Sequence, residues 1–233
     1  MNGLITHAHS AQMSPDAFLE KLVDMETRER DARNLARRTS TATLGPFNTM
    51  DTFDWDHPKS IDRPLVEELF ALDFLKTSPP HNILLRGPAG VGKTTIAQNL
   101  GFDALKAGHT VRFSTLPMAL ADLLKQESLP AVERRMKRYT APDLLILDEL
   151  GYLPCDSQAA DAFFNIVSRR HELKSIIITT NLPFKSWRDV FPNATGLGAL
   201  IDRFTEHCYV VDIDAESYRQ RKSRAVRRKK TAA

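Results

Sequence analysis

Short apolar runs alternate with amphipathic stretches along most of the chain. Uninterrupted apolar runs predict strands that are buried on both faces, and apolar residues at every third or fourth position predict helices packed on one side. Strands are expected at residues 83–85, 111–113, 144–147, 175–181 and 208–211, and helices at 61–75, 95–106, 117–125, 129–139, 157–170, 184–190 and 199–207. This alternation predicts an α/β fold in which helices cover both faces of a parallel sheet.

A longer and more polar helix is predicted ahead of this body. Ser14, Pro15 and Asp16 combine a capping hydroxyl, a proline in the first turn and an acid near the positive helix end. A thin apolar stripe continues to about residue 38, and acid–base pairs four residues apart predict a solvated face, at Asp24–Arg28, Glu26–Arg30 and Glu29–Arg33. We expect a helical region and linker at 1–46, with the linker at 39–46, a main domain at 47–214 and a tail at 215–233.

One junction between a strand and a helix carries a phosphate-binding motif. Gly87-x-x-x-x-Gly92-Lys93-Thr94 follows the strand at 83–85 and opens the helix at 95–106, which is the order that a phosphate loop requires. Backbone amides and the positive helix end would bind phosphate oxygens, Lys93 would reach the β- and γ-phosphates, and the Thr94 hydroxyl would bind Mg²⁺. The expected nucleotide contacts are Gly87, Pro88, Ala89, Gly90, Val91, Gly92, Lys93, Thr94 and Thr95. A chance glycine-rich turn is disfavoured, so the chain is predicted to bind a nucleoside triphosphate.

Polar residues end two of the predicted strands. Asp148 and Glu149 follow the apolar run at 144–147, at the strand end where open α/β sheets bind ligands. We expect Asp148 to hold the Mg²⁺ shell and Glu149 to activate the water that attacks the γ-phosphate. Asn181 ends the run at 175–181 and could bind the γ-phosphate or that water. Capping of the helix near Pro183 is a nearly equal alternative for Asn181.

The stretch at 47–58 carries Phe53, Trp55 and His57 among aspartates, without helical or strand periodicity. Rings in such a stretch need a surface to pack on. We favour the interpretation that they clamp this connector onto the main domain. The alternative is that they wall the base of the nucleotide.

Composition restricts the class of protein. The 233 residues suit one domain with appendages, and 42% hydrophobic with 26% charged residues is ordinary for a globular protein. No apolar run approaches the roughly 18 residues of a membrane span, and the first residues lack a secretory pattern. Cys155 and Cys208 have no C-x-x-C spacing or histidine partner and suit reduced thiols. We therefore expect a cytoplasmic protein without a membrane partner.

Basic residues are concentrated near the C-terminus. Eight of them and no acid lie from Arg219 onward, whereas the rest of the chain has 24 basic and 29 acidic residues. Such a tail suits nucleic acid, although a solvated tail without a ligand is an equally open alternative. Arg37 and Arg38 lack an i,i+4 partner and could touch a phosphate backbone. The predicted helix at 129–139 carries a further candidate group for DNA, for which a plain exposed face is the alternative: Arg134, Arg135, Lys137 and Arg138.

Further motifs occur in a fixed order after the phosphate loop and the acidic pair. They lie at 148–154, at 179–184 with Trp187, at 202–204 and at 216–219. With these motifs the chain resembles the IstB family, the helper ATPases of insertion-sequence transposons, which are related to the helicase loader DnaC within the AAA+ class. The resemblance covers about residues 50–222.

The resemblance implies a AAA+ P-loop domain at 47–214 with a five-stranded parallel sheet in the order 5-1-4-3-2. It also implies that ATP lies between the subunits of a ring or spiral. Asn181 matches the first sensor position, and Arg203 matches the arginine finger, which reaches the ATP of the neighbouring subunit. Without the resemblance, Arg203 would be interpreted as an ion-pair partner. The implied catalytic set is Lys93, Glu149, Asn181 and Arg203.

The family binds double-stranded DNA with ATP and presents it to a transposase. The same is expected here, with binding largely independent of DNA sequence because the chain has no zinc finger or clear helix-turn-helix. The alternative is a helicase loader that acts on single-stranded DNA. A non-hydrolysing ATP switch and a small-molecule kinase are disfavoured, because adjacent acids at 148–149 suit water activation.

Overall fold

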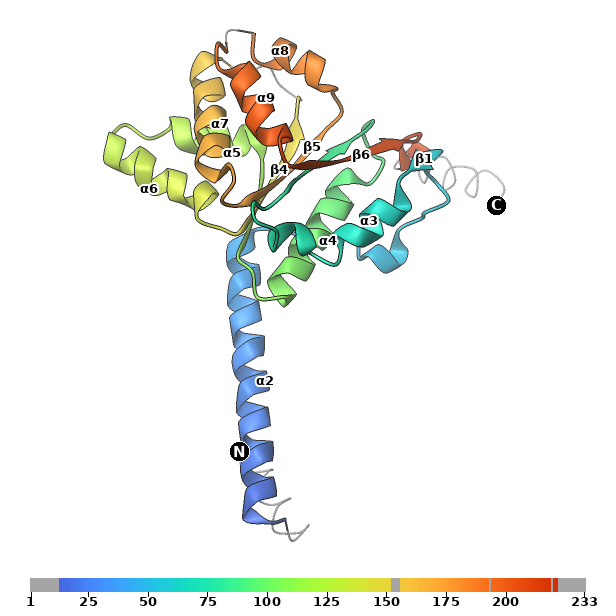
Figure 1. The fold of residues 1–233 in the computed structure, drawn as a ribbon, viewed down its shortest axis with the longest axis vertical. Helices are drawn as coiled ribbons and strands as arrows, with labels where there is room; N and C mark the ends of the chain where they lie inside the picture. The colour runs from blue at the N-terminus through green and yellow to red at the C-terminus, as the bar shows by residue number, and fades with distance from the viewer. Residues whose placement is uncertain (1–12, 152–155, 193, 219, 222–233) are drawn as a thin grey trace, which may run out of the picture.

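The computed structural model describes residues 13–151, 156–192, 194–218 and 220–221 (Figure 1). Predictions about Cys155, Arg219 and most of the basic tail concern residues outside these ranges. The six strands are β1 (Ser60–Ile61), β2 (Asn82–Arg86), β3 (Val111–Thr115), β4 (Leu144–Leu150), β5 (Ser175–Thr180) and β6 (Cys208–Asp214). They form one sheet in the order β1-β6-β2-β5-β4-β3. The five long strands are parallel and confirm the predicted order, and the two-residue β1 adds an unpredicted antiparallel edge.

Helices cover both faces of this sheet, as predicted (Figure 1). The helical elements are α2 (Pro15–Ala42), η1 (Met50–Thr52), α3 (Arg63–Leu69), η2 (Asp73–Leu75), α4 (Lys93–Lys106), α5 (Leu116–Leu124), α6 (Leu129–Thr140), α7 (Ser157–Arg170), η3 (Phe184–Ser186), α8 (Trp187–Val190) and α9 (Leu197–Thr205). Successive residues of a buried strand pack against the helix layers on opposite faces of the sheet. Leu84 of β2 faces the layer of α5, α7 and α9, whereas its neighbours Ile83 and Leu85 face the layer of α3 and α4. Among the described helices, none is long and apolar enough to cross a bilayer.

Helix α2 projects from the body and is anchored at its C-terminal end (Figure 1). The Ser14 side chain caps its start, as predicted, but the helix continues to Ala42 and takes in half of the expected linker. The Arg38 guanidinium donates to the carbonyl of Leu105 at 3.0 Å, and the Thr43 hydroxyl donates to the carbonyl of Phe113 at 2.6 Å. Arg38 therefore helps hold α2 against the body, and its contact with DNA stays a prediction.

Several local predictions differ from the structure. The helix expected at 61–75 ends at Leu69, because Leu72 takes a left-handed conformation with φ 61°. On α6, Met136 and Tyr139 are buried, but Leu129, expected on the same face, is 82% exposed. Arg33 pairs with Glu26 at 3.0 Å, seven residues away, instead of with Glu29.

The buried side chain of Arg170 lies at the end of the sheet where β4 and β5 begin, opposite the carboxyl ends of the strands. Its guanidinium donates to five backbone carbonyls, those of Tyr139, Thr140, Pro142, Asp143 and Ser175. Burial lowers the pKa of Arg170 to about 9, which leaves it charged at neutral pH. The side chain thereby holds the starts of β4 and β5 and the end of α6 together, satisfying carbonyls that would otherwise be buried without donors.

Replacing Arg170 with Met should destabilise the fold by about 3 kcal/mol or more, because five buried carbonyls lose a donor. Urea unfolding followed by circular dichroism measures the loss. The neighbouring Arg169→Met is the matched control, since Arg169 forms an exposed ion pair with Glu133 and should shift the midpoint little. Equal shifts for the two variants would contradict the role given to Arg170.

Candidate nucleotide-binding site

The phosphate loop connects β2 to α4 and has the backbone that its glycines permit. Gly90 and Gly92 have φ values of 80° and 101°, a region that other residues rarely adopt. A side chain at Gly92 would also lie 2.6 Å from Cε2 of Phe53. The loop therefore needs glycine at this position both for its conformation and for the close approach of the preceding connector.

Lys93 is the first residue of α4, at the positive end of the helix. Its ammonium donates to the carbonyls of Gly87 and Pro88, at 2.7 Å each. The first two residues of the loop thus hold the Lys93 side chain, whereas the residues from Ala89 to Thr95 line the adjoining cavity. Cation, helix end and loop amides converge, which is the arrangement that binds a chain of phosphates.

Asp148 is buried at the end of β4 and is surrounded by hydroxyl donors. The Thr94 hydroxyl lies 3.0 Å from both of its carboxylate oxygens. The Thr179 hydroxyl donates to Oδ1 of Asp148 and accepts from the backbone amide of Glu149 at 3.1 Å. The hydroxyl and carboxylate oxygens of Thr94 and Asp148 are the hard ligands that Mg²⁺ prefers, so this donor set fits the ion.

Glu149 leaves the regular path of β4. The register of β4 against β5 shifts between Leu147 and Leu150, and Glu149 itself has φ 65°. Such a conformation is uncommon for a residue with a side chain and costs free energy. In this position the Glu149 side chain is exposed and lines the cavity, whereas Asp148 beside it is only 4% exposed.

One cavity of about 250 Å³ brings most of the predicted site together. It is lined by Ala89, Gly90, Val91, Gly92, Lys93, Thr94 and Thr95 of the loop, by Asp148, Glu149 and Asn181, and by Asn48, Thr52, Phe53, Asp54, His57, Pro58, Thr179, Thr180 and Tyr218. Phe53 and Trp55 pack against the buried core, which confirms the favoured interpretation that this stretch is held against the main domain, and their rings meet edge-on at 4.8 Å. Phe53 and His57 also line the pocket, whereas their contact with a nucleotide base stays a prediction. The helix η3 after Asn181 has no side-chain cap, so the capping alternative for Asn181 is not realised.

Sequence reasoning assigned no site role to Thr179 or Tyr218. Thr179 was visible only as one of the hydroxyl residues that end the strand at 175–181. Its role depends on the pairing of β5 with β4, which brings its hydroxyl to Asp148. Tyr218 comes from beyond the last strand, and nothing in its local sequence indicates that it returns to the phosphate loop.

Arg203 does not line this cavity. On α9, its guanidinium donates to the Ser168 hydroxyl at 2.6 Å and lies 5.0 Å from the ring centroid of Phe164. Within the described ranges it forms no ion pair, so the alternative of an ion-pair partner finds no carboxylate.

The basic group of α6 also lies outside the cavity. Arg135 and Arg138 lie 3.5 and 3.6 Å from the carboxylate of Asp122 on α5, which offsets part of their charge. Arg134 and Lys137 are exposed, and among the described residues neither forms an ion pair. Glu133, expected to pair with Lys137, instead binds Arg169 through two hydrogen bonds of 2.6 and 2.7 Å.

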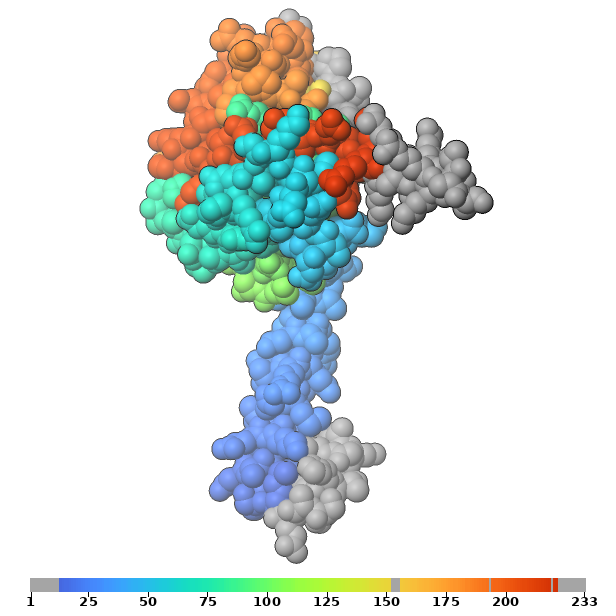
Figure 2. Space-filling model, turned by 90° about the vertical axis from the view of Figure 1, so that its right-hand side faces the viewer, coloured from blue at the N-terminus to red at the C-terminus, as the bar shows by residue number. Residues whose placement is uncertain are grey.

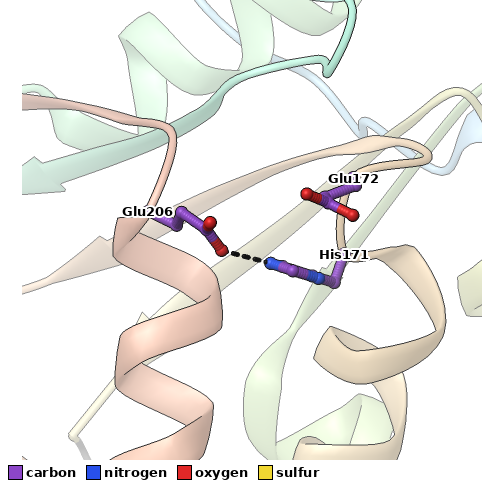
Figure 3. Close-up of side chains that lie close together, drawn as sticks. All are labelled: His171, Glu172 and Glu206. Atoms are coloured by element: carbon purple, nitrogen blue, oxygen red, sulfur yellow. Dashed lines mark hydrogen bonds and ion pairs between the residues drawn. The ribbon is translucent and has the colours of Figure 1, made fainter.

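A second ionisable group lies where α7 and α9 end (Figure 3). His171, Glu172 and Glu206 bring potential ligand atoms within 4.8 Å of one another, which is a spacing that a metal ion could use. However, Nε2 of His171 already bonds the Glu206 carboxylate at 2.8 Å. This bond links the C-terminal ends of α7 and α9 and explains why the three side chains lie close together.

Comparison with known proteins now identifies the family. The profile described as IstB-like ATP binding protein matches residues 1–226. The chain belongs to this family. A Pseudomonas aeruginosa protein named for insertion sequence IS21 and for ATP binding is 35% identical over 224 residues, or 96% of this chain and 84% of the relative. A Bacillus thuringiensis subsp. berliner protein named for insertion sequence IS232 and for ATP binding is 36% identical over 206 residues, or 87% and 82%. The resemblance inferred from the motifs is thus confirmed.

Solved structures confirm the AAA+ P-loop fold of this IstB-like chain. DnaI aligns with a TM-score of 0.59 and 17% identity, covering 73% of this chain and 92% of DnaI. The DnaC helicase loader aligns with a TM-score of 0.53 and 19% identity, covering 71% and 96%. AMPPCP-bound DnaA from Aquifex aeolicus gives 0.59 and 23%, covering 73% and 51%. At these identities the likeness extends to the fold alone.

Replacing Thr179 with Val should destabilise the protein by about 1–3 kcal/mol, because the Asp148 carboxylate loses a donor and the Glu149 amide loses its acceptor. Urea unfolding measures this loss. Thr179→Ser keeps the hydroxyl and should retain most of the stability, which separates the hydrogen bonds from packing. A Val variant as stable as the Ser variant would contradict the network.

Proposed function

We propose that this protein is the helper ATPase of an insertion-sequence transposon, assembling on duplex DNA with ATP and recruiting or stimulating a transposase. Family membership and the insertion-sequence names of its relatives support the setting. The observation that carries the activity is the position of Glu149, exposed toward the same cavity as the phosphate loop and next to the buried Asp148. A nucleotide-binding switch without hydrolysis would have no use for this second carboxylate.

The triphosphate of ATP would bind along the loop amides at the start of α4. The Lys93 ammonium would exchange its two loop carbonyls for β- and γ-phosphate oxygens. Thr94 and Asp148 would hold Mg²⁺, which offsets the negative charge of the phosphates when it is bound. Thr179 keeps the Asp148 carboxylate oriented toward Thr94.

Glu149 would act as the general base for hydrolysis. Its carboxylate accepts a proton from water while the water oxygen bonds to the γ-phosphorus. The bond from that phosphorus to the β–γ bridging oxygen breaks, and ADP leaves with the electron pair. Asn181 lines the same cavity and would hydrogen-bond the water or the γ-phosphate.

Arg203 would complete the site of a neighbouring subunit. Negative charge spreads over the γ-phosphate in the transition state, and a fixed guanidinium stabilises it. Because Arg203 does not line the cavity of its own chain, this cation would arrive only after assembly into a ring or spiral. Turnover would therefore depend on self-association.

DNA would bind through its backbone, with Arg134, Arg135, Lys137 and Arg138 of α6 and the basic tail as candidate contacts. Arg134 and Lys137 are the stronger candidates, because Arg135 and Arg138 share Asp122. The helicase-loader alternative has the same ATPase chemistry and differs in preferring single-stranded DNA.

A mixing experiment tests hydrolysis and assembly together. Glu149→Gln should bind ATP normally but lose turnover at least about 100-fold, since the general base is removed. Arg203→Ala should bind ATP and lose turnover about 1,000-fold. An equal mixture should regain turnover at about a quarter of the sites, where an intact Glu149 meets an intact Arg203 of the next subunit.

The matched control is Arg188→Ala, which removes an exposed arginine of α8 and should keep full turnover. Phosphate release is the measurement, and ATP binding of each variant is checked separately. Full turnover by Glu149→Gln would overturn the general base. A mixture no more active than its components would overturn the role of Arg203 between subunits.

Binding to DNA gives the second test. With ATP present, affinity for a duplex should exceed affinity for a single strand of equal length, and its logarithm should fall linearly with that of the salt concentration. The double variant Arg134→Ala/Lys137→Ala should reduce this slope by about 2. Lys76→Ala, whose ammonium pairs with Asp73 at 2.9 Å, should leave the slope unchanged. A preference for single strands would favour the helicase-loader alternative.

A further inference from the structure

Two segments that are far apart in the sequence, one before the first strand and one after the last, meet at the phosphate loop. Residues 53–58 precede β1, and residues 215–221 follow β6 at the end of the described chain. Antiparallel pairing of β1 with β6 brings them together. Figure 2 shows the end of the described chain, in red, against the cyan segment that follows the long helix. We call the described residues of this segment, 215–218 and 220–221, the C-terminal clasp.

The clasp bonds directly to the phosphate loop. The backbone amide of Tyr218 donates to the carbonyl of Gly90 at 3.0 Å. A side chain at Gly90 would lie 2.4 Å from the Ser217 hydroxyl, so glycine is needed there for the clasp to approach. One glycine of the phosphate loop therefore contacts the clasp as well as lining the cavity.

His57 bridges two points of the clasp. Its Nε2 lies 2.8 Å from the carbonyl of Glu216, and its Nδ1 lies 2.8 Å from Nη1 of Arg221. A carbonyl can only accept and a guanidinium can only donate, so both contacts are hydrogen bonds when the ring donates from Nε2 and accepts at Nδ1. Its ring also meets that of Tyr218 edge-on at 5.1 Å, and Arg221 lies 3.6 Å from Asp54.

The groups that close the clasp also wall the cavity. His57, Asp54 and Tyr218 all line the space beside the phosphate loop, so a nucleotide there would touch both sides of the clasp. Anything that binds better to the closed arrangement stabilises it by the same free energy that the closed arrangement adds to binding.

We infer that His57 is a positioning residue that closes the C-terminal clasp over the nucleotide site, so that ATP in the cavity holds residues 215–221 in place. The inference rests on the proposed function, because it takes ATP as the ligand. It gives the cavity a link to the basic end of the chain, where eight basic residues begin at Arg219. Closure fixes the Arg221 end of the clasp through its contacts with His57 and Asp54.

Hydrogen exchange of the full chain, read by mass spectrometry on peptides covering 215–221, tests the clasp. A non-hydrolysable ATP analogue with Mg²⁺ should slow exchange of this segment about tenfold, through the amides of Tyr218 and Arg221. In His57→Phe, which keeps a ring but loses both polar contacts, the analogue should slow exchange less than about twofold. His57→Gln keeps one donor and one acceptor and should recover part of the protection.

Two controls separate positioning from general damage. His109→Phe changes a histidine just before β3, outside the cavity, and should behave as the wild type. Inorganic tripolyphosphate reports on the phosphate loop alone. His57→Phe should bind it within about threefold of the wild type, but should bind ATP about fivefold to tenfold more weakly, since hydrogen bonds of the closed clasp are lost.

The outcomes separate the clasp from the proposed function. A wild-type protein that binds no ATP overturns both. ATP binding without any change in exchange at 215–221 overturns the clasp alone, as does unaltered protection in His57→Phe. Equal weakening of ATP and tripolyphosphate would make His57 a support of the phosphate loop and would also overturn its positioning role.

Discussion

A buried carboxylate must find hydrogen-bond donors, and the donors of Asp148 hold the nucleotide site together. Thr94 belongs to α4, Thr179 belongs to β5, and Asp148 lies near the C-terminal end of β4. Two hydroxyls thus join the helix after the phosphate loop to the neighbouring strands β4 and β5. The same Thr179 hydroxyl accepts from the Glu149 amide, which helps hold that residue at its positive φ. One hydrogen-bond network therefore aligns the phosphate loop, the candidate metal ligands and the candidate base.

The opposite edge of the sheet relies on a cation in the same way. Arg170 supplies donors to five backbone carbonyls where β4 and β5 begin. Strands are stiff over a few residues. Holding the starts of these two strands in register therefore also sets the positions of Asp148 and Thr179 relative to each other, near the other ends of the strands. A residue far from the cavity thereby contributes to the accuracy of the site.

Two groups of residues would relate the site of one chain to different partners. Toward a neighbouring subunit, Arg203 stands apart from its own cavity and would serve another one. Toward the C-terminus, Tyr218 and His57 join the cavity to the segment that leads into the basic tail. Under the proposed function, nucleotide binding, self-association and DNA binding would therefore be linked through this site.

The sequence by itself determined the α/β class, the phosphate loop and the Asp148–Glu149 pair, because each depends on local spacing within strand–loop–helix units. The hydrophobic periodicity of the sequence did not predict that Leu129 is exposed, that α2 continues to Ala42 or that the helix expected at 61–75 ends at Leu69. These outcomes depend on competing tertiary contacts. Only the tertiary structure decided the roles of Arg170, Thr179 and Tyr218. Most of their partners lie far away in the chain, and only the packing of strands, helices and loops brings them within hydrogen-bond distance.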